Sequence, residues 1–243
     1  MKNKKGLTKM SIYAIADLHL SFNHPKPMDI FGDNWENHTE KLKRDWLLKV
    51  KENDTVIIPG DFSWETYLED AYQDFNFLNS LPGKKILLKG NHDYWWTTLT
   101  NIRKFLKDNH FDTIEILFNN SYEIEDYIVA GARGWDYAQS GDRKIIEREI
   151  GRLELSLKDA KKRNPQKEII VCMHYPPISK KHIENEFERK IIFLLQEYNV
   201  KKCFYGHLHG TAHNEAVMGI KEGIDFQLVS ADYLDFKLFP VKE

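Results

Sequence analysis

The residues best suited to chemistry are aspartates, asparagines and histidines that follow directly after short apolar runs. Carboxylate oxygens and imidazole nitrogens are common ligands of divalent ions such as Mn, Fe and Zn. The motifs, in chain order, are Asp17-Leu18-His19, Gly60-Asp61, Gly90-Asn91-His92-Asp93, His174 and Gly206-His207-Leu208-His209. The predicted metal ligands within them are Asp17, His19, Asp61, Asn91, His174, His207 and His209.

Each motif has a physical reason to suit metal binding. An Asp-x-His turn can place an oxygen and a nitrogen on the same ion, and the two oxygens of Asp61 can bridge two ions. His207 and His209 lie two residues apart, so on an extended segment their rings point to the same side. Taken alone, Asp17-Leu18-His19 is weak evidence and Gly60-Asp61 is weaker, since Gly-Asp commonly forms turns, whereas His207-Leu208-His209 is moderate evidence. Their combination after every predicted core strand favours a metal site over coincidence.

The elements that must position these residues follow from the hydrophobic pattern. Short runs rich in Ile, Val and Leu predict buried strands, and longer amphipathic stretches between them predict helices. The predicted strands are Met10–Ala16, Thr55–Pro59, Lys85–Lys89, Glu168–Met173 and Lys202–Tyr205. The predicted helices are Trp35–Val50, Glu65–Leu78, Thr97–Lys107, Asp142–Lys162 and Glu186–Tyr198. This alternation predicts parallel βαβ units, in which ligands bind at the carboxyl ends of the strands.

Four further apolar runs predict strands of another kind. They are separated by turns and lack long helices between them, so we expect antiparallel or edge strands. These runs are Ile114–Phe118, Tyr127–Ala130, Phe226–Val229 and Phe236–Phe239. With no linker or repeat in the chain, residues 10–243 are expected to form a single domain, after a flexible tail at residues 1–9.

Composition narrows the classes of function. The chain has 243 residues and a formal net charge of -2, so it has no bulk electrostatic attraction for nucleic acid or for an anionic membrane. No apolar stretch approaches the length of a membrane span, and no secretory signal is visible. We therefore expect a cytoplasmic protein, with Cys172 and Cys203 as buried free thiols. The pattern leaves the oligomeric state open.

Taken in order, the motifs from Asp17 to His209 resemble those of the calcineurin-like metallophosphoesterase superfamily. The resemblance implies an α/β fold, a four-layer α/β/β/α sandwich of two mixed sheets flanked by helices, and a cofactor of two divalent metal ions (Mn, Fe, Zn or a mixture). It assigns the first ion to Asp17, His19, Asp61 and His209, and the second to Asp61, Asn91, His174 and His207, with Asp61 bridging. It also gives His92 a catalytic role in assisting the leaving group, with Asp93 orienting it.

The resemblance further implies hydrolysis of a small phosphomonoester or phosphodiester by in-line attack of a hydroxide that bridges the ions. The alternatives are a nuclease or cyclic-nucleotide phosphodiesterase, or a non-catalytic metal-binding scaffold. The protein phosphatase branch carries an Asp and an Arg soon after its Gly-Asp motif. Here Asp61 is followed by Phe62-Ser63-Trp64-Glu65, which disfavours phosphoprotein as the substrate.

Four residues are candidates for substrate binding: Arg133, Trp64, Tyr94 and Trp135. Arg133 is flanked by glycines and could clamp a phosphate, or it could be an ordinary surface arginine. The aromatic rings could stack a base or an aryl leaving group, but walls of the metal site are the favoured interpretation. The Pro25–Trp35 loop is long enough to overhang the site.

Overall fold

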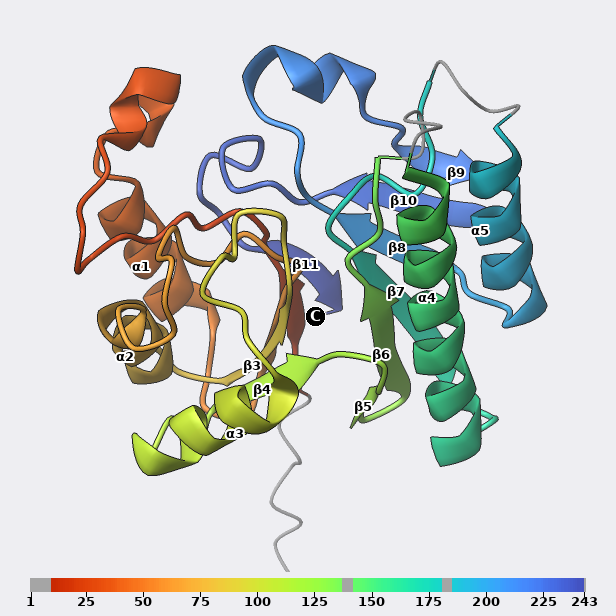
Figure 1. Ribbon diagram of the computed structural model, residues 1–243, viewed down its shortest axis with the longest axis horizontal. Coiled ribbons are helices and arrows are strands. Elements are labelled where there is room, and N and C mark those ends of the chain that lie inside the picture. The colour runs from red at the N-terminus through yellow and green to blue at the C-terminus, as the bar shows by residue number, and fades with distance from the viewer. Residues whose placement is uncertain (1–9, 137–141, 181–184, 243) are drawn as a thin grey trace, which may run out of the picture.

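Two β-sheets lie face to face in the computed structural model of the protein, with helices on their outer sides (Figure 1). The structure describes residues 10–136, 142–180 and 185–242, so the tail predicted at residues 1–9 lies outside the described residues. The first sheet has the order β11 (Phe239–Lys242), β1 (Ile12–Ala14), β2 (Thr55–Ile58), β3 (Lys84–Leu88) and β4 (Ile114–Leu117). The second has the order β5 (Tyr122–Ile124), β6 (Tyr127–Ala132), β7 (Glu168–Met173), β8 (Lys202–Tyr205), β10 (Ile224–Leu228) and β9 (Gly219–Lys221).

The helices divide between the two outer faces according to their apolar residues. The first sheet is covered by α1 (His38–Lys49), α2 (Tyr72–Ser80) and α3 (Leu99–Asp108), whose buried residues join one hydrophobic cluster with strands β1 to β4. The second is covered by α4 (Arg143–Arg163) and α5 (Glu186–Glu197). Short 3₁₀ turns lie at Met28–Phe31, Asp33–Trp35 and Gly210–Glu215.

A third apolar cluster fills the space between the sheets. Strand side chains alternate between faces, so one set packs on the helices and the other set packs on the opposite sheet. Ile57 and Leu88 of the first sheet join Ile170 and Phe204 of the second in this cluster. The layers therefore follow the order α/β/β/α, and the predicted four-layer sandwich of two mixed sheets is confirmed.

The buried strands that the hydrophobic pattern predicts are present with small shifts at their ends, but the other runs need correction. Strands β4, β6 and β10 pair in parallel with β3, β7 and β8. The expectation of antiparallel or edge strands holds in part, because β4 lies at the edge of its sheet, and β6 and β10 pair antiparallel with β5 and β9. It missed the parallel pairing on the other side of β6 and β10 and the parallel direction of β4. Helix α3 precedes β4 and α4 lies between β6 and β7, so both provide the crossover that parallel pairing requires.

Two further boundaries differ from the prediction. Phe236 is buried in a turn, and β11 begins only at Phe239. The helix predicted from Glu65 begins at Tyr72, because the preceding loop is held to its neighbours by other bonds. The Glu65 carbonyl accepts the Trp95 N–H, and its carboxylate accepts the backbone N–H of His24.

Two further expectations from the sequence concern the cysteines and membrane-spanning segments. Cys172 and Cys203 are buried free thiols, as expected. None of the helices in the described part of the chain is both long and apolar enough to cross a membrane.

Candidate metal centre

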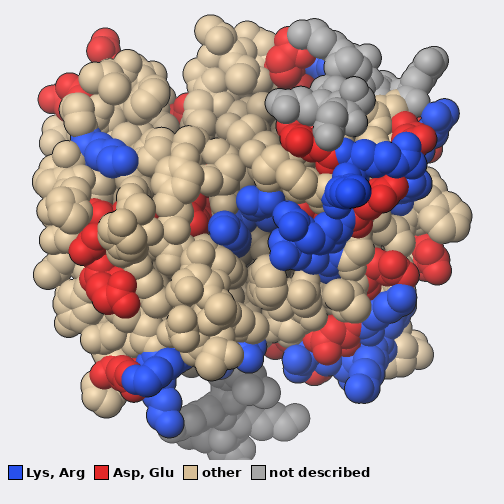
Figure 2. All heavy atoms as spheres, in the orientation of Figure 1, with Lys and Arg blue, Asp and Glu red and all other residues tan. Residues whose placement is uncertain are grey.

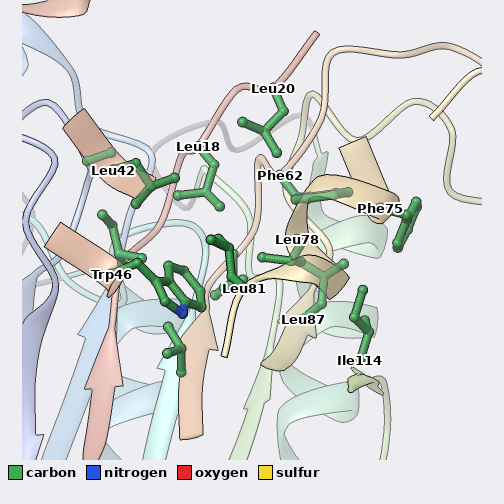
Figure 3. Packing of buried hydrophobic residues seen from close by; sticks show 14 of the residues in the cluster. Leu18, Leu20, Leu42, Trp46, Phe62, Phe75, Leu78, Leu81, Leu87 and Ile114 are labelled. Carbon is green, nitrogen blue, oxygen red and sulfur yellow. The ribbon is translucent and has the colours of Figure 1, made fainter. Parts of the chain in front are cut away.

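The loops after β1, β2, β3, β7 and β8 meet at one edge of the sandwich and bring the predicted ligands together. Leu18 and Leu20 point into the core beneath the first sheet's helices, as Phe62 does after β2 (Figure 3). Asp17, His19 and Asp61 are buried polar residues in the same loops. Apolar neighbours therefore anchor the loops that carry the first ligands.

One group of donors gathers around His19. Its Nε2 atom lies 3.4 Å from Nε2 of His209 and 3.7 Å from Oδ2 of Asp61. The His209 Nε2 atom is in turn 3.8 Å from Oδ1 of Asp17. These four side chains can surround one cation.

A second group gathers around Asn91. Its Oδ1 atom lies 2.6 Å from Nε2 of His174 and 2.8 Å from Nδ1 of His207. The same His174 nitrogen is 3.5 Å from Oδ2 of Asp61. Asp61 therefore belongs to both groups, and each group has the donor set that divalent transition metals prefer.

The hydrogen bonds around Asp61 test whether a cation fits between the groups. Its Oδ1 atom accepts the backbone N–H of His92 at 2.8 Å. Its Oδ2 atom is buried and accepts no hydrogen bond from the described residues. A buried carboxylate oxygen without a partner is costly, and a cation would offset that cost. The residues present therefore fit a metal centre.

The backbone at this edge is unusual. Asp17, His19, Asp61 and His207 all have positive φ angles, of 60°, 46°, 50° and 76°. Left-handed backbone is unfavourable for residues other than glycine and is concentrated at functional sites. The turns thus direct these side chains toward the centre. Their left-handed backbone makes this arrangement conformationally unfavourable.

Neighbouring glycines allow the backbone segments to approach closely. A Cβ atom on Gly90 would lie 2.0 Å from Oδ1 of Asp61, and one on Gly206 would lie 2.5 Å from Oδ2 of Asp17. Gly60 has a φ angle of 89°. The glycines before Asp61, Asn91 and His207 therefore serve the tight turns and close approach that the sequence suggests.

Outer hydrogen bonds orient the histidine rings. His174 Nδ1 lies 3.0 Å from the carbonyl of Pro59, which leaves Nε2 facing the centre. His209 Nδ1 lies 2.9 Å from Oδ1 of Asp232, and its Nε2 also faces the centre. Such partners on the far ring nitrogen are typical of metal-binding histidines.

Asp93 is fully buried and acts on the backbone of these loops. Its carboxylate accepts the N–H groups of Asp61, Phe62, Ser63 and Gly90, and the indole N–H of Trp95. Among the described residues these bonds give no support to the expectation that Asp93 orients His92. Its visible role is to hold the Asp61 loop against the Gly90 turn.

Burial and mutual charge shift the pKa values of the donors. Burial raises the pKa of Asp17 to about 7 and that of Asp61 to about 6. Burial lowers the pKa of His174 to about 3. Burial alone would also lower the pKa of His209, but the carboxylates of Asp17 and Asp232 raise it to about 9. Metal binding must displace the proton that His209 then carries at neutral pH.

The half-buried ring of His92 lies at the mouth of the centre. It packs 4.3 Å from Trp64 and 5.6 Å from His19 between ring centroids, and its Nδ1 atom is 3.4 Å from the Tyr94 hydroxyl. Burial lowers the pKa of His92, which favours the neutral ring. Tyr94 itself is 58% exposed.

The other substrate-binding candidates lie close to the centre. Trp64 stacks on His19 at 4.7 Å and so forms a wall of the site. The Arg133 guanidinium lies 4.6 Å from the ring of Trp135 and 3.5 Å from Glu149, and its side chain is only 14% exposed. Arg133 is therefore not an ordinary surface arginine. Trp135 and His207 line the same cavity of about 210 Å³.

Sequence reasoning missed three residues near the centre. Asp232 orients His209, Tyr175 packs 4.2 Å from His207, and the Lys26 ammonium lies 4.7 Å above Trp64. Asp232 follows β10, so recognising β10 as a parallel strand would have pointed to it. Tyr175 and Lys26 carry no comparable signal in the sequence.

Comparisons with known proteins concern the family and the fold. The protein family described as calcineurin-like phosphoesterase matches residues 10–211 of the chain. The Gene 66 protein of Mycobacterium phage L5 is 34% identical over 80 residues, which are 32% of this chain and 37% of that protein. The match thus spans little more than a third of the phage protein.

Solved structures share the fold at low identity. TT1561 of Thermus thermophilus superimposes with a TM-score of 0.53 at 13% identity, covering 95% of this chain and 97% of that one. A protein of unknown function, AQ665 of Aquifex aeolicus, gives 0.52 at 17% identity and covers 96% of both chains. GAP50, the anchor in the inner membrane complex of Plasmodium, gives 0.51 at 14% identity, covering 92% and 72%.

Proposed function

Because the chain belongs to the calcineurin-like phosphoesterase family, we propose that it hydrolyses a small phosphomonoester or phosphodiester with two divalent metal ions. The observation that carries the proposal is the position of Asp61, which joins both groups of donors with a buried, unpartnered Oδ2 atom. The first ion would be held by Asp17, His19, Asp61 and His209. The second would be held by Asp61, Asn91, His174 and His207.

The ions would supply Lewis acidity toward the phosphoryl oxygens and a nucleophilic hydroxide near neutral pH. The chain's own residues position this chemistry. Asp93 and Asp232 hold the ligand-bearing loops and the His209 ring in place. His92 is fixed through its backbone N–H on Asp61, and in its protonated form it would stabilise or protonate the departing oxygen.

Several observations favour an enzyme over a non-catalytic scaffold. All the predicted ligands lie together, and His92 is at the mouth where a leaving group would pass. A scaffold has no need to keep such a ring beside the donors. The net charge of -2 favours a small substrate over a long nucleic acid. We also propose that the protein acts in the cytoplasm.

The test uses Asp61→Ala beside the unchanged chain. We expect the wild-type protein, supplied with Mn²⁺, to hydrolyse p-nitrophenyl phosphate or bis-p-nitrophenyl phosphate. The ratio of the two hydrolysis rates then separates a monoesterase from a diesterase. Asp61→Ala should lose both ions, as measured by elemental analysis after gel filtration, together with activity. A full metal content in the variant would refute the shared ligand, and a metal-loaded wild type inactive on both esters would favour the scaffold.

A further inference from the structure

A group of cations surrounds one buried carboxylate beside the metal centre. The Glu149 side chain is fully buried in α4, and its Oε1 atom lies 2.6 Å from Nη1 of Arg152. The same oxygen is 3.5 Å from Nη2 of Arg133 and 3.8 Å from Nε of Arg148. Figure 2 shows Lys and Arg atoms running across the middle of this face toward the region of α4.

This cation cluster, defined here as Lys89, Arg133 and Arg152, includes two residues whose backbone adjoins predicted metal ligands. Lys89 ends the β3 segment and directly precedes the Gly90-Asn91 turn. The Arg133 carbonyl accepts the N–H of His174 at 3.1 Å, so the residue is tied to a predicted ligand. All three cations line a recess between the ends of β3, β4 and β6. Its enclosed part, about 10 Å³, has room for about one water, so a phosphate group would contact the outer edges of these side chains.

Aromatic rings hold the cations in place without neutralising them. The Arg133 guanidinium lies 4.6 Å from the centroid of Trp135, and that of Arg152 lies 4.9 Å from the centroid of Phe118. Cation–π contacts of this kind fix a guanidinium plane and leave its edge free for an anion.

The charges in the cluster do not balance. Glu149 is the single carboxylate that the cavity lining contributes, against the cations of Lys89, Arg133 and Arg152. Arg152 at 2.6 Å and Arg133 at 3.5 Å share the same Glu149 oxygen, so one negative charge faces three positive charges. The Arg133 Nε atom is buried and has no hydrogen-bond partner among the described residues. A partly dehydrated donor in surplus is a site for an acceptor that the protein does not itself provide.

We propose that this cluster binds a second phosphate group of the same small substrate, while the metal centre binds the phosphate that is cleaved. This inference rests on the proposed function and narrows the substrate to one with two phosphate groups, such as a diphosphate or a bisphosphate. Arginine edges suit the paired oxygens of a phosphate. Since the cluster is small and the net charge of the chain is -2, a long nucleic acid is not its intended ligand.

The experiment measures binding of phosphonates, whose P–C bonds the protein would not hydrolyse. Methylphosphonate and diphosphonates with one to three carbons between the phosphorus atoms are titrated into the Mn²⁺-loaded full chain by calorimetry at fixed free Mn²⁺. We expect one diphosphonate to bind at least about tenfold more tightly than methylphosphonate, the size of one charge-assisted hydrogen bond.

Variants assign that preference to the cluster. Arg133→Met and Lys89→Met should each reduce it about tenfold, whereas Arg189→Met, which removes the same charge from the exposed side of α5, should leave it unchanged. Lys89→Met leaves the contacts of Arg133 and Arg152 with Glu149 intact. If Arg133→Met does not fold, Lys89→Met therefore shows whether the preference for a diphosphonate depends on the cluster.

The outcomes separate the two proposals. Equal binding of methylphosphonate and every diphosphonate, or a preference that survives in Lys89→Met and in a folded Arg133→Met, would overturn the second phosphate site. A preference that depends on the cluster, in a metal-loaded protein that hydrolyses no phosphate ester, would support the site and contradict the proposed function.

Discussion

At the scale of single residues, His92 and Asp61 divide the work of the site. Asp61 joins the two groups of donors, and its other oxygen holds the backbone of His92. His92 lies against Trp64 and Tyr94 at the mouth, which is where the proposed mechanism needs a group that acts on the leaving oxygen.

Replacing His92 should therefore affect turnover and leave metal binding intact. We expect His92→Ala to keep its metal content and to lose about 10²- to 10⁴-fold in kcat, the range for loss of a general acid. The loss should be larger for alkyl phosphates than for p-nitrophenyl phosphate, because an alkoxide needs the proton more. Wild-type turnover with both leaving groups would remove His92 from the mechanism.

Asp232 offers a second prediction at this scale. Its carboxylate contacts Nδ1 of His209 at 2.9 Å and the N–H of Gly210 at 3.1 Å. Asp232→Asn keeps the shape but removes the charge, so metal affinity should fall about 10- to 100-fold. Asp225→Asn, on β10, is the matched control. Equal affinities of the two variants in a chelator competition would show that Asp232 does not orient a ligand.

The raised pKa values give the metal affinity a pH dependence. In the metal-free protein His209 holds a proton up to about pH 9, Asp17 up to about pH 7 and Asp61 up to about pH 6. Because binding of the first ion needs all three groups deprotonated, the affinity should rise about tenfold per unit from pH 7 to 9 and up to about 100-fold per unit from pH 6 to 7. Below pH 6 the rise should be steeper still. Chelator competition at several pH values, corrected for the chelator, measures this slope. An affinity independent of pH would contradict the protonated His209.

At the scale of elements, the site depends on how closely the strand ends approach. Asp17 and Gly206 lie at the ends of β1 and β8, which belong to different sheets, and the backbones of Ala16 and Val229 are hydrogen-bonded there at 2.8 Å. The two sheets thus meet directly beneath the ligands.

Gly206→Ala tests this approach. The new Cβ would lie 2.5 Å from Oδ2 of Asp17 and 2.6 Å from Cβ of Ala16, so the two strand ends must separate. We expect a loss of about 1–3 kcal/mol in the free energy of unfolding, together with weaker metal binding. Gly151→Ala in α4 meets nothing within 4 Å and should instead be stabilising by about 0.5–1 kcal/mol. Gly206→Ala with the stability and metal affinity of wild type would contradict the close approach.

Elements also show what the sequence could predict. The motifs after β1, β2, β3, β7 and β8 were identifiable, because each follows an apolar run that is typical of a buried strand. Asp232 was not, because Phe226–Val229 gave no sign of its parallel pairing across the Gly210–Glu215 turn. The bonds of Asp93 also depend on contacts between distant loops, which hydrophobic periodicity does not contain.

At the scale of the whole molecule, the predicted ligands come from both sheets. The first sheet supplies Asp17, His19, Asp61 and Asn91, and the second supplies His174, His207 and His209. The four-layer order was predictable from the family resemblance and is confirmed. The single domain over residues 10–243 stays a prediction, and the cation cluster required knowledge of how β3, β6 and α4 adjoin.

The most direct measurement is anomalous X-ray scattering from crystals of the full chain grown with Mn²⁺. The account predicts two peaks about 3.5–4 Å apart, with Asp61 contacting both, the side chains of His19 and His209 on one peak, and those of His174 and His207 on the other. A single peak, or two peaks that do not share Asp61, would contradict it.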